Sequence, residues 1–152
     1  MDNLLKSKTR LAFIQIIFEN LSTKNDIFNI FTIFNSNYKS TFVENFHDKG
    51  QIKFEFNSNF LKKLIIFYYE YTKSENYLDL IDLYIDFNRS FKKWDLINQS
   101  ILLAALSELH NIEKKKIKIV LNDYLNIGKS FVEDKEVGTI NAILDKIIYD
   151  KK

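Results

Sequence analysis

Apolar residues recur at helical spacing along most of this 152-residue chain, and almost nothing in the sequence interrupts them. There is no proline and there are only three glycines, which favours long helices joined by short polar turns. No segment shows the sustained alternation of apolar and polar residues that a half-buried strand needs. Phe54 and Phe56 alternate over too short a stretch to indicate one. The pattern therefore predicts an all-α fold.

The spacing predicts a bundle of about seven helices. The expected helices cover residues 4–21, 26–46, 58–71, 76–87, 96–109, 117–127 and 135–148, and N-S-N at residues 35–37 can break the second of them into two pieces. Asn57 or Ser58 can cap the third helix, and Asp95 can cap the fifth. The centre of this fifth helix, I-L-L-A-A-L, is apolar nearly all round, so we expect it in the middle of the bundle. The phenylalanines between residues 27 and 60 keep helical spacing, which favours core positions over a separate partner surface.

Length and charge limit the class of protein. A chain of this length predicts one domain, residues 1–152. It has no cysteine, hence no disulfide or thiolate metal site. The longest apolar run, Ile101–Leu106, is too short for a membrane span, and the N-terminus lacks the pattern of a secretory signal. We expect a soluble cytoplasmic protein that does not bind membranes. The net charge of +2 means that any nucleic-acid site must be a local patch.

Nothing in the sequence indicates catalysis. His47 and His110 have no partners at metal-ligand spacing, and helix-end or surface positions are expected for both. The three glycines do not fall in a phosphate-binding loop motif. We therefore expect no enzymatic activity, no metal site and no cofactor.

The N-terminal segment carries a cluster of cations. Lys6 and Arg10 are four residues apart and share a helix face, while Lys8 lies toward the other side. Such cations can neutralise phosphates at one end of a helix whose remainder lies in the core. They can equally be solvated surface residues, and the cluster alone does not decide between the two.

Three motifs in order resemble the NusB family. From Lys118 the chain has K-I-V-L-N-D-Y-L-N-I-G-K-S-F, and from Ile140 it has I-N-A-I-L-D-K. They resemble the family's K-V-x-I-N-E-A-x-E-L-A-K-x-F and F-V-N-G-V-L-D-K. The N-terminal K-S-K-T-R, followed by Gln15, is similar to R-R-x-A-R-x-x-A-x-Q. Trp94 with S-I-L-L-A-A-L-S-E-L is similar to W…A-x-L-R-x-A-x-Y-E-L. Residues 22–92 carry no such motif.

The resemblance implies a NusB-like bundle that binds boxA-type single-stranded RNA together with the ribosomal protein NusE. This assembly joins the RNA polymerase antitermination complex on ribosomal RNA operons. The implied RNA-binding residues are Lys6, Lys8, Arg10, Gln15, Lys135 and Asn141. Several positions depart from the family pattern. Ser7 and Leu103 replace arginines, Ser107 replaces a tyrosine, and Thr139 replaces a phenylalanine that could stack on a base.

Three alternatives remain open at the level of sequence. The chain could be a protein-interaction module that keeps the fold and the NusE partner but has lost tight RNA binding. It could be the RNA-binding domain of an RNA cytosine methyltransferase, although no glycine-rich cofactor-binding domain or catalytic cysteine is present. It could also form a homodimer that covers its own basic surface.

Overall fold

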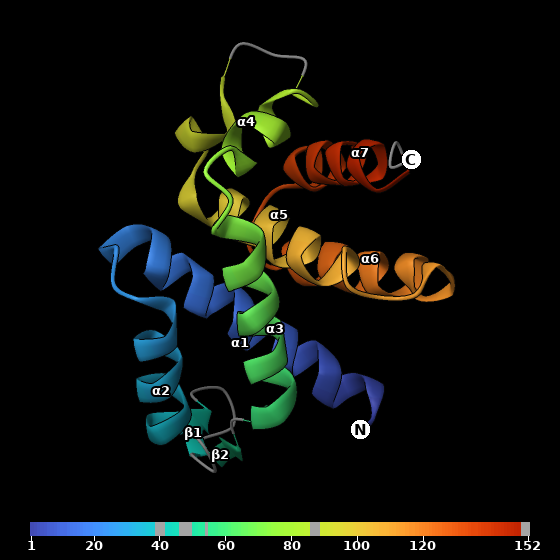
Figure 1. Cartoon of the computed structure of the whole chain (residues 1–152). Helices are drawn as coiled ribbons and strands as arrows, with labels where there is room; N and C mark the ends of the chain where they lie inside the picture. The colour runs from blue at the N-terminus through green and yellow to red at the C-terminus, as the bar shows by residue number, and fades with distance from the viewer. Residues whose placement is uncertain (39–41, 46–49, 54, 86–88, 150–152) are drawn as a thin grey trace.

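Helices dominate the structure, a computed structural model that describes residues 1–38, 42–45, 50–53, 55–85 and 89–149 (Figure 1). The seven α-helices within these ranges are α1 (Asn3–Thr23), α2 (Ile27–Tyr38), α3 (Ser58–Thr72), α4 (Tyr77–Asp82), α5 (Leu96–Leu109), α6 (Lys114–Gly128) and α7 (Asp134–Tyr149). A short 3-10 helix, η1 (Phe91–Lys93), precedes α5. The predicted all-α fold with about seven helices is confirmed.

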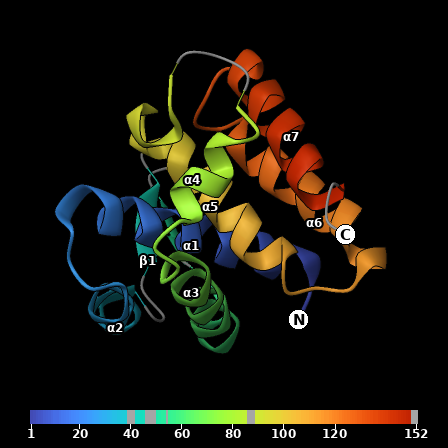
Figure 2. The same ribbon diagram turned by 45° about the horizontal axis from the view of Figure 1, so that its top comes forward.

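Helix α5 forms the centre of the molecule, as its apolar sequence predicts. Every residue from Gln99 to Leu109 is buried. Helices α1 and α3 contact α5 on one side, and α6 and α7 contact it on the other (Figures 1 and 2). Ala104 and Ala105 are fully buried, and their small side chains let neighbouring helices approach closely. Asp95 precedes the helix as predicted, although its side chain makes no capping hydrogen bond.

Helix α1 begins at a capping residue and buries one long face. The side chain of Asp2 accepts a hydrogen bond from the Leu5 amide at 2.7 Å. Phe13, Ile14 and Ile17 are fully buried in the core. The spacing predicts Leu4 and Phe18 on this face too. In the structure, however, Leu4 is 65% exposed and Phe18 is 39% exposed. Leu4 lies in the first turn at the free end of α1, and Phe18 lies beside an open hollow described below.

The predicted helix over residues 26–46 is wrong in its second half. Helix α2 ends at Tyr38, and β1 (Phe42–Asn45) pairs antiparallel with β2 (Gly50–Lys53), with Phe42 opposite Lys53. This two-stranded hairpin is the β structure of the described residues, in a fold that is otherwise helical. Asparagine and serine at 35–37 are weak helix formers, whereas phenylalanine and valine at 42 and 43 favour strands. The predicted end at Phe46 and the alternating Phe54 lie outside the described residues.

Phenylalanines of α2 and α3 contribute to the core. Within residues 27–60, those partly buried against the core are Phe28, Phe31 and Phe34 of α2, Phe56 just before α3, and Phe60 of α3. The rings of Phe34 and Phe56 lie 5.4 Å apart between centroids. For the described part of the chain, the predicted core role of these aromatic residues is confirmed.

The C-terminal helices follow the predicted pattern with shifted ends. Helix α4 stops at Asp82, short of the predicted Phe87, which lies outside the described residues. Helix α6 starts at Lys114, so the three consecutive lysines form its first turn instead of a loop. Acidic Asp134 and Glu136 in the first turn of α7, and Lys146 in its last, complement the helix dipole. Helices α6 and α7 lie side by side, joined by a short turn (Figures 1 and 2).

Candidate functional site

A buried ion-pair network joins the basic end of α1 to the C-terminal half. The guanidinium of Arg10 donates from Nε and Nη2 to the two carboxylate oxygens of Glu108, both at 2.8 Å. Its Nη1 donates to Asp123 of α6 at 2.7 Å. Ser7 donates to the other oxygen of Asp123 at 2.6 Å, and the Tyr124 hydroxyl donates to Glu108 at 2.7 Å. The network therefore connects α1, α5 and α6.

Burial makes this network strongly interdependent. Arg10 is only 7% exposed and Glu108 only 3%. Burial disfavours the charged guanidinium, but the hydrogen bond and charge of Glu108, together with the hydrogen bond of Asp123, outweigh it and raise the pKa of Arg10. Burial, with the charge of Glu108, raises the pKa of Tyr124 well above its usual value, so this phenol stays protonated and keeps donating. Aromatic rings of Phe60 and Tyr124 flank the guanidinium at 5.5 and 5.7 Å.

Lys6 and Lys8 remain available at the start of α1. Both are half-buried, and neither forms an ion pair with a described residue. The adjacent Thr9 is buried, and its hydroxyl accepts a hydrogen bond from the backbone N–H of Asn57 at 2.9 Å. This bond connects the basic turn of α1 to the start of α3. The two lysines are therefore held on a well-anchored helical turn.

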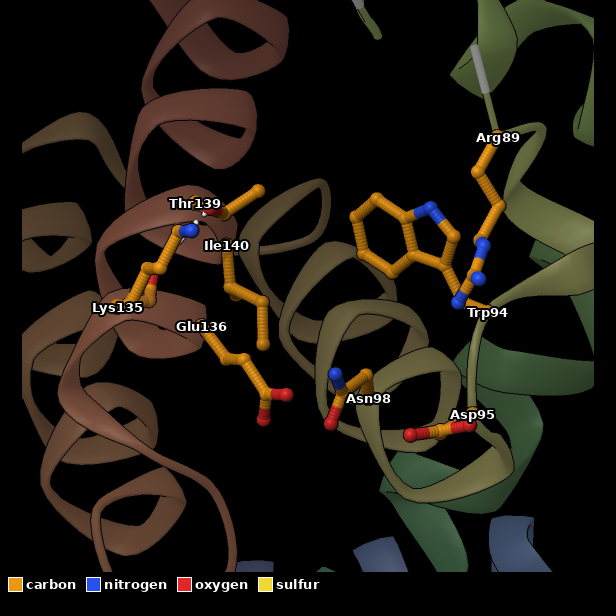
Figure 3. A pocket seen from close by; sticks show the side chains of 8 residues that line it. All are labelled: Arg89, Trp94, Asp95, Asn98, Lys135, Glu136, Thr139 and Ile140. Atoms are coloured by element: carbon orange, nitrogen blue, oxygen red, sulfur yellow. Dashed lines mark hydrogen bonds between the residues drawn. The ribbon is translucent and has the colours of Figure 1, made fainter. Parts of the chain in front are cut away.

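A groove of about 360 Å³ lies between α7 and the segment that leads into α5 (Figure 3). Lys135 and Thr139 of α7 face Arg89 and Trp94 across it, and Asn98 lies at its α5 end. The two walls also carry Glu136 and Asp95, so each wall holds one cation and one acid. The charges of this groove are therefore balanced, which makes it a poor electrostatic site for a polyanion.

A second hollow, of about 470 Å³, lies beside α1 and is almost entirely apolar. Ile14 and Ile97 lie in its lining together with Phe18 and Phe131, which are 39% and 43% exposed. Gln15 also lines this hollow and is exposed. Exposed aromatic residues around an apolar hollow are typical of protein interfaces.

A third hollow, the amide groove, runs between α6 and α7 with a volume of about 520 Å³. It is defined by the side chains of Asn122 and Asn126 from α6 and Asn141 from α7. Lys129 and Asp134 supply one charge of each sign. The residues that define the groove are exposed, and none of their amides forms a hydrogen bond with a described residue.

Comparison with known proteins agrees with the motifs on these helices. A sequence model of the NusB family matches residues 7–149. The chain belongs to the NusB family. It is 29% identical to the transcription antitermination protein NusB of Blochmanniella floridana over 151 residues, covering 99% of this chain and 97% of that protein. The protein of the same name from Rickettsia felis (strain ATCC VR-1525 / URRWXCal2) is 25% identical over 148 residues, 93% of this chain and 90% of that protein.

The match to NusB confirms the family resemblance found in the sequence. NusB-family factors are not enzymes, which agrees with the prediction for this chain. His110 lies at the C-terminal end of α5, as predicted, while His47 lies outside the described residues. Among the described residues no group of three or more histidine, aspartate or glutamate side chains could hold a metal ion. None of the helices in the described ranges is long and apolar enough to cross a membrane.

The predicted contact of Arg10 with phosphate disagrees with the structure. Arg10 is buried, and its hydrogen-bonding groups are directed to Glu108 and Asp123. A guanidinium held by two carboxylates has little capacity left for an anion. Arg10 in this NusB-family chain therefore connects helices, and only Lys6 and Lys8 of the basic turn are available to a ligand.

The other predicted residues do not share one surface. Lys135 lies in the groove beside α5, Gln15 in the apolar hollow, and Asn141 in the amide groove. Lys135 and Asn141 are six residues apart in α7, which places them about 120° apart around the helix, on different faces. The structure also brings in Asn122, Asn126 and Lys129, which the prediction missed. Their spacing at three- and four-residue intervals on an amphipathic helix was the available signal.

Proposed function

We propose that this protein binds boxA-type single-stranded RNA together with the ribosomal protein NusE, within the RNA polymerase antitermination complex. It does so in the cytoplasm, as a single helical domain of residues 1–152. The observation that carries this proposal is the family match across residues 7–149. It is supported by relatives named transcription antitermination protein NusB, which align with this chain over 90% or more of their own lengths.

Lys6 and Lys8 are the proposed phosphate contacts. They lie on a helical turn fixed by Thr9 and Arg10, and their charges are not compensated by described acids. Asn141, Lys135 and Gln15 line three different hollows, so they are proposed as separate additional RNA contacts and not as one continuous surface. Arg10 acts as a positioning residue, because it holds the basic turn against α5 and α6.

The apolar hollow is the proposed contact for NusE. Phe18 and Phe131 present aromatic surface there without a covering element of the described chain. Aromatic residues are enriched at the centres of protein interfaces, where they contribute most of the binding free energy. This location leaves the lysines of α1 free for RNA.

A second candidate function is a NusB-family interaction module with weak RNA binding. Two observations favour it. Arg10 is taken up by the ion-pair network, and Thr139 presents no ring to the groove of Figure 3. Such a module would retain NusE in a pull-down while boxA-like RNA bound no better than other RNA.

Fluorescence anisotropy of labelled RNA tests the proposal. We expect tighter binding to a boxA-like strand than to a scrambled strand of the same length. Lys8→Ala should reduce the slope of log K against log salt by about 0.7–0.9, because one phosphate contact is lost. Lys24→Ala, at the opposite end of α1, is the matched control and should leave the slope unchanged. Equal binding to both strands would contradict RNA recognition, and an unchanged slope in Lys8→Ala would remove Lys8 from the site.

A further inference from the structure

The amide groove has a composition that the proposed contacts do not use. Asn122 and Asn126 are four residues apart on α6, and Asn141 reaches the groove from α7. A side-chain amide carries both a donor and an acceptor, so it can form a paired hydrogen bond with the edge of a base. These amides have no partner among the described residues, hence they can bind a ligand without breaking internal bonds.

The apolar floor of the groove and its open side can accommodate the flat ring of a nucleobase. Leu125 and Val137 line it and provide apolar surface between the amides. Gly138 of α7 also lines it, and a Cβ placed on Gly138 would meet no atom within 4 Å. The space above Gly138 is therefore open and is not required for packing of the two helices.

Lys129 and Asp134 balance each other within the groove, and Lys118, just outside it, adds one further cation. Lys129 lies in the groove, and Lys118 lies on the same stripe of α6, four residues before Asn122. The two lysines are about 16 Å apart along the helix axis, enough for several stacked nucleotides at roughly 3.4 Å each. Neither forms an ion pair with a described acid. Cations at both ends of a row of amides fit phosphates flanking exposed bases better than they fit a peptide.

We infer that the amide groove binds bases of single-stranded RNA, with Asn122, Asn126 and Asn141 on the base edges and Lys118 and Lys129 on the phosphates. This inference rests on the proposed RNA-binding function and adds a base-reading surface to it. Asp123, the next residue after Asn122, holds the basic turn of α1 against α6. The side chains of Asn122 and Asp123 leave α6 about 100° apart, so the groove and the basic turn lie on neighbouring sides of this helix.

Two kinds of variant test the groove by anisotropy with boxA-like and scrambled RNA. The double variant Asn122→Ala/Asn126→Ala should weaken binding of the boxA-like strand at least tenfold, with little loss for the scrambled strand. Its salt slope should stay unchanged, because no charge is removed. Asn29→Ala, an exposed asparagine on α2, is the matched control. Gly138→Leu should fill the groove and weaken binding similarly, whereas Gly138→Ala should bind like the original protein.

The outcomes separate the groove from the proposed function. A protein that prefers boxA-like RNA while all groove variants bind like the original would overturn the inference and leave the proposed function intact. A protein without any preference for boxA-like RNA would overturn both. Loss of NusE binding in the groove variants with unchanged RNA affinity would assign the groove to a peptide and would also overturn the inference. If the double asparagine variant fails to fold, the RNA affinity of the Gly138→Leu variant tests the inference instead.

Discussion

Arg10 shows how one residue type can take two roles. Its place in a basic N-terminal cluster suggests phosphate binding, but it lies four residues before buried Ile14 and three before buried Phe13. That spacing already puts Arg10 on the core face of α1. The sequence could predict a buried arginine from this periodicity, but it could not predict Glu108 and Asp123 as partners. They lie 98 and 113 residues away, and only the packing of α1 against α5 and α6 brings them together.

Arg10→Ala should destabilise the fold by about 3–5 kcal/mol, because it leaves Glu108 buried without its cation. Urea unfolding of the purified variant measures this loss. Lys8→Ala serves as the comparison and should stay within about 0.5 kcal/mol of the original protein. An Arg10→Ala protein of normal stability that lost RNA affinity would contradict the positioning role and return Arg10 to the RNA surface.

Buried tyrosines predict a loss of stability at alkaline pH. Burial, together with the nearby Tyr77, raises the pKa of Tyr71 to about 12 and raises that of Tyr68 further. Unfolded tyrosines ionise near pH 10, so the unfolded state releases protons before the folded state does. The stabilisation is complete below about pH 10 and is lost as the pH rises toward 12 and beyond.

The free energy of unfolding should therefore fall between about pH 9 and about pH 11. The free energy of unfolding of the Tyr71→Phe variant should fall less over this range, because the substitution removes one of the groups that titrate. Urea unfolding at the two pH values measures the difference. A stability that is flat across the range, or an unchanged fall in Tyr71→Phe, would contradict the assignment.

At the scale of elements, apolar periodicity predicted the helices well and the hairpin poorly. The bounds of α5 were predicted at Leu96 and Leu109, because a nearly continuous apolar run follows a capping aspartate. The end of α2 was missed, because Phe34, Tyr38 and Phe42 keep four-residue spacing whether or not the helix continues. The strand pairing that begins at Phe42 depends on β2, and a one-dimensional pattern does not contain that partner.

Leu103 of α5 stands where the family pattern has arginine, and it is fully buried. Leu103→Arg should destabilise the fold severely, because it places an uncompensated charge in the core of the described structure. Leu103→Met should cost less than about 1.5 kcal/mol, because its volume is similar. Thermal unfolding of the two variants tests the pair. A stable Leu103→Arg protein would show that α5 has a solvent-accessible side at this position.

At the scale of the molecule, sequence motifs could predict the family but not the layout of the candidate site. The motifs fix which residues occur on α1, α6 and α7. They do not fix which side of α7 each residue takes relative to its neighbours. Lys135 and Asn141 belong to one motif region and yet line different grooves, because α7 packs between them against α5 and α6. The charge balance of the groove beside α5 likewise depends on Arg89 and Asp95, which no motif includes.

Joint binding of RNA and NusE is the central claim, and its direct measurement is one titration. Labelled boxA-like RNA is titrated with this protein at moderate salt, in the absence and in the presence of NusE, with scrambled RNA as control. We expect a preference for the boxA-like strand that NusE strengthens. Equal, weak binding to both strands that NusE does not change would contradict it and would leave a NusB-family interaction module.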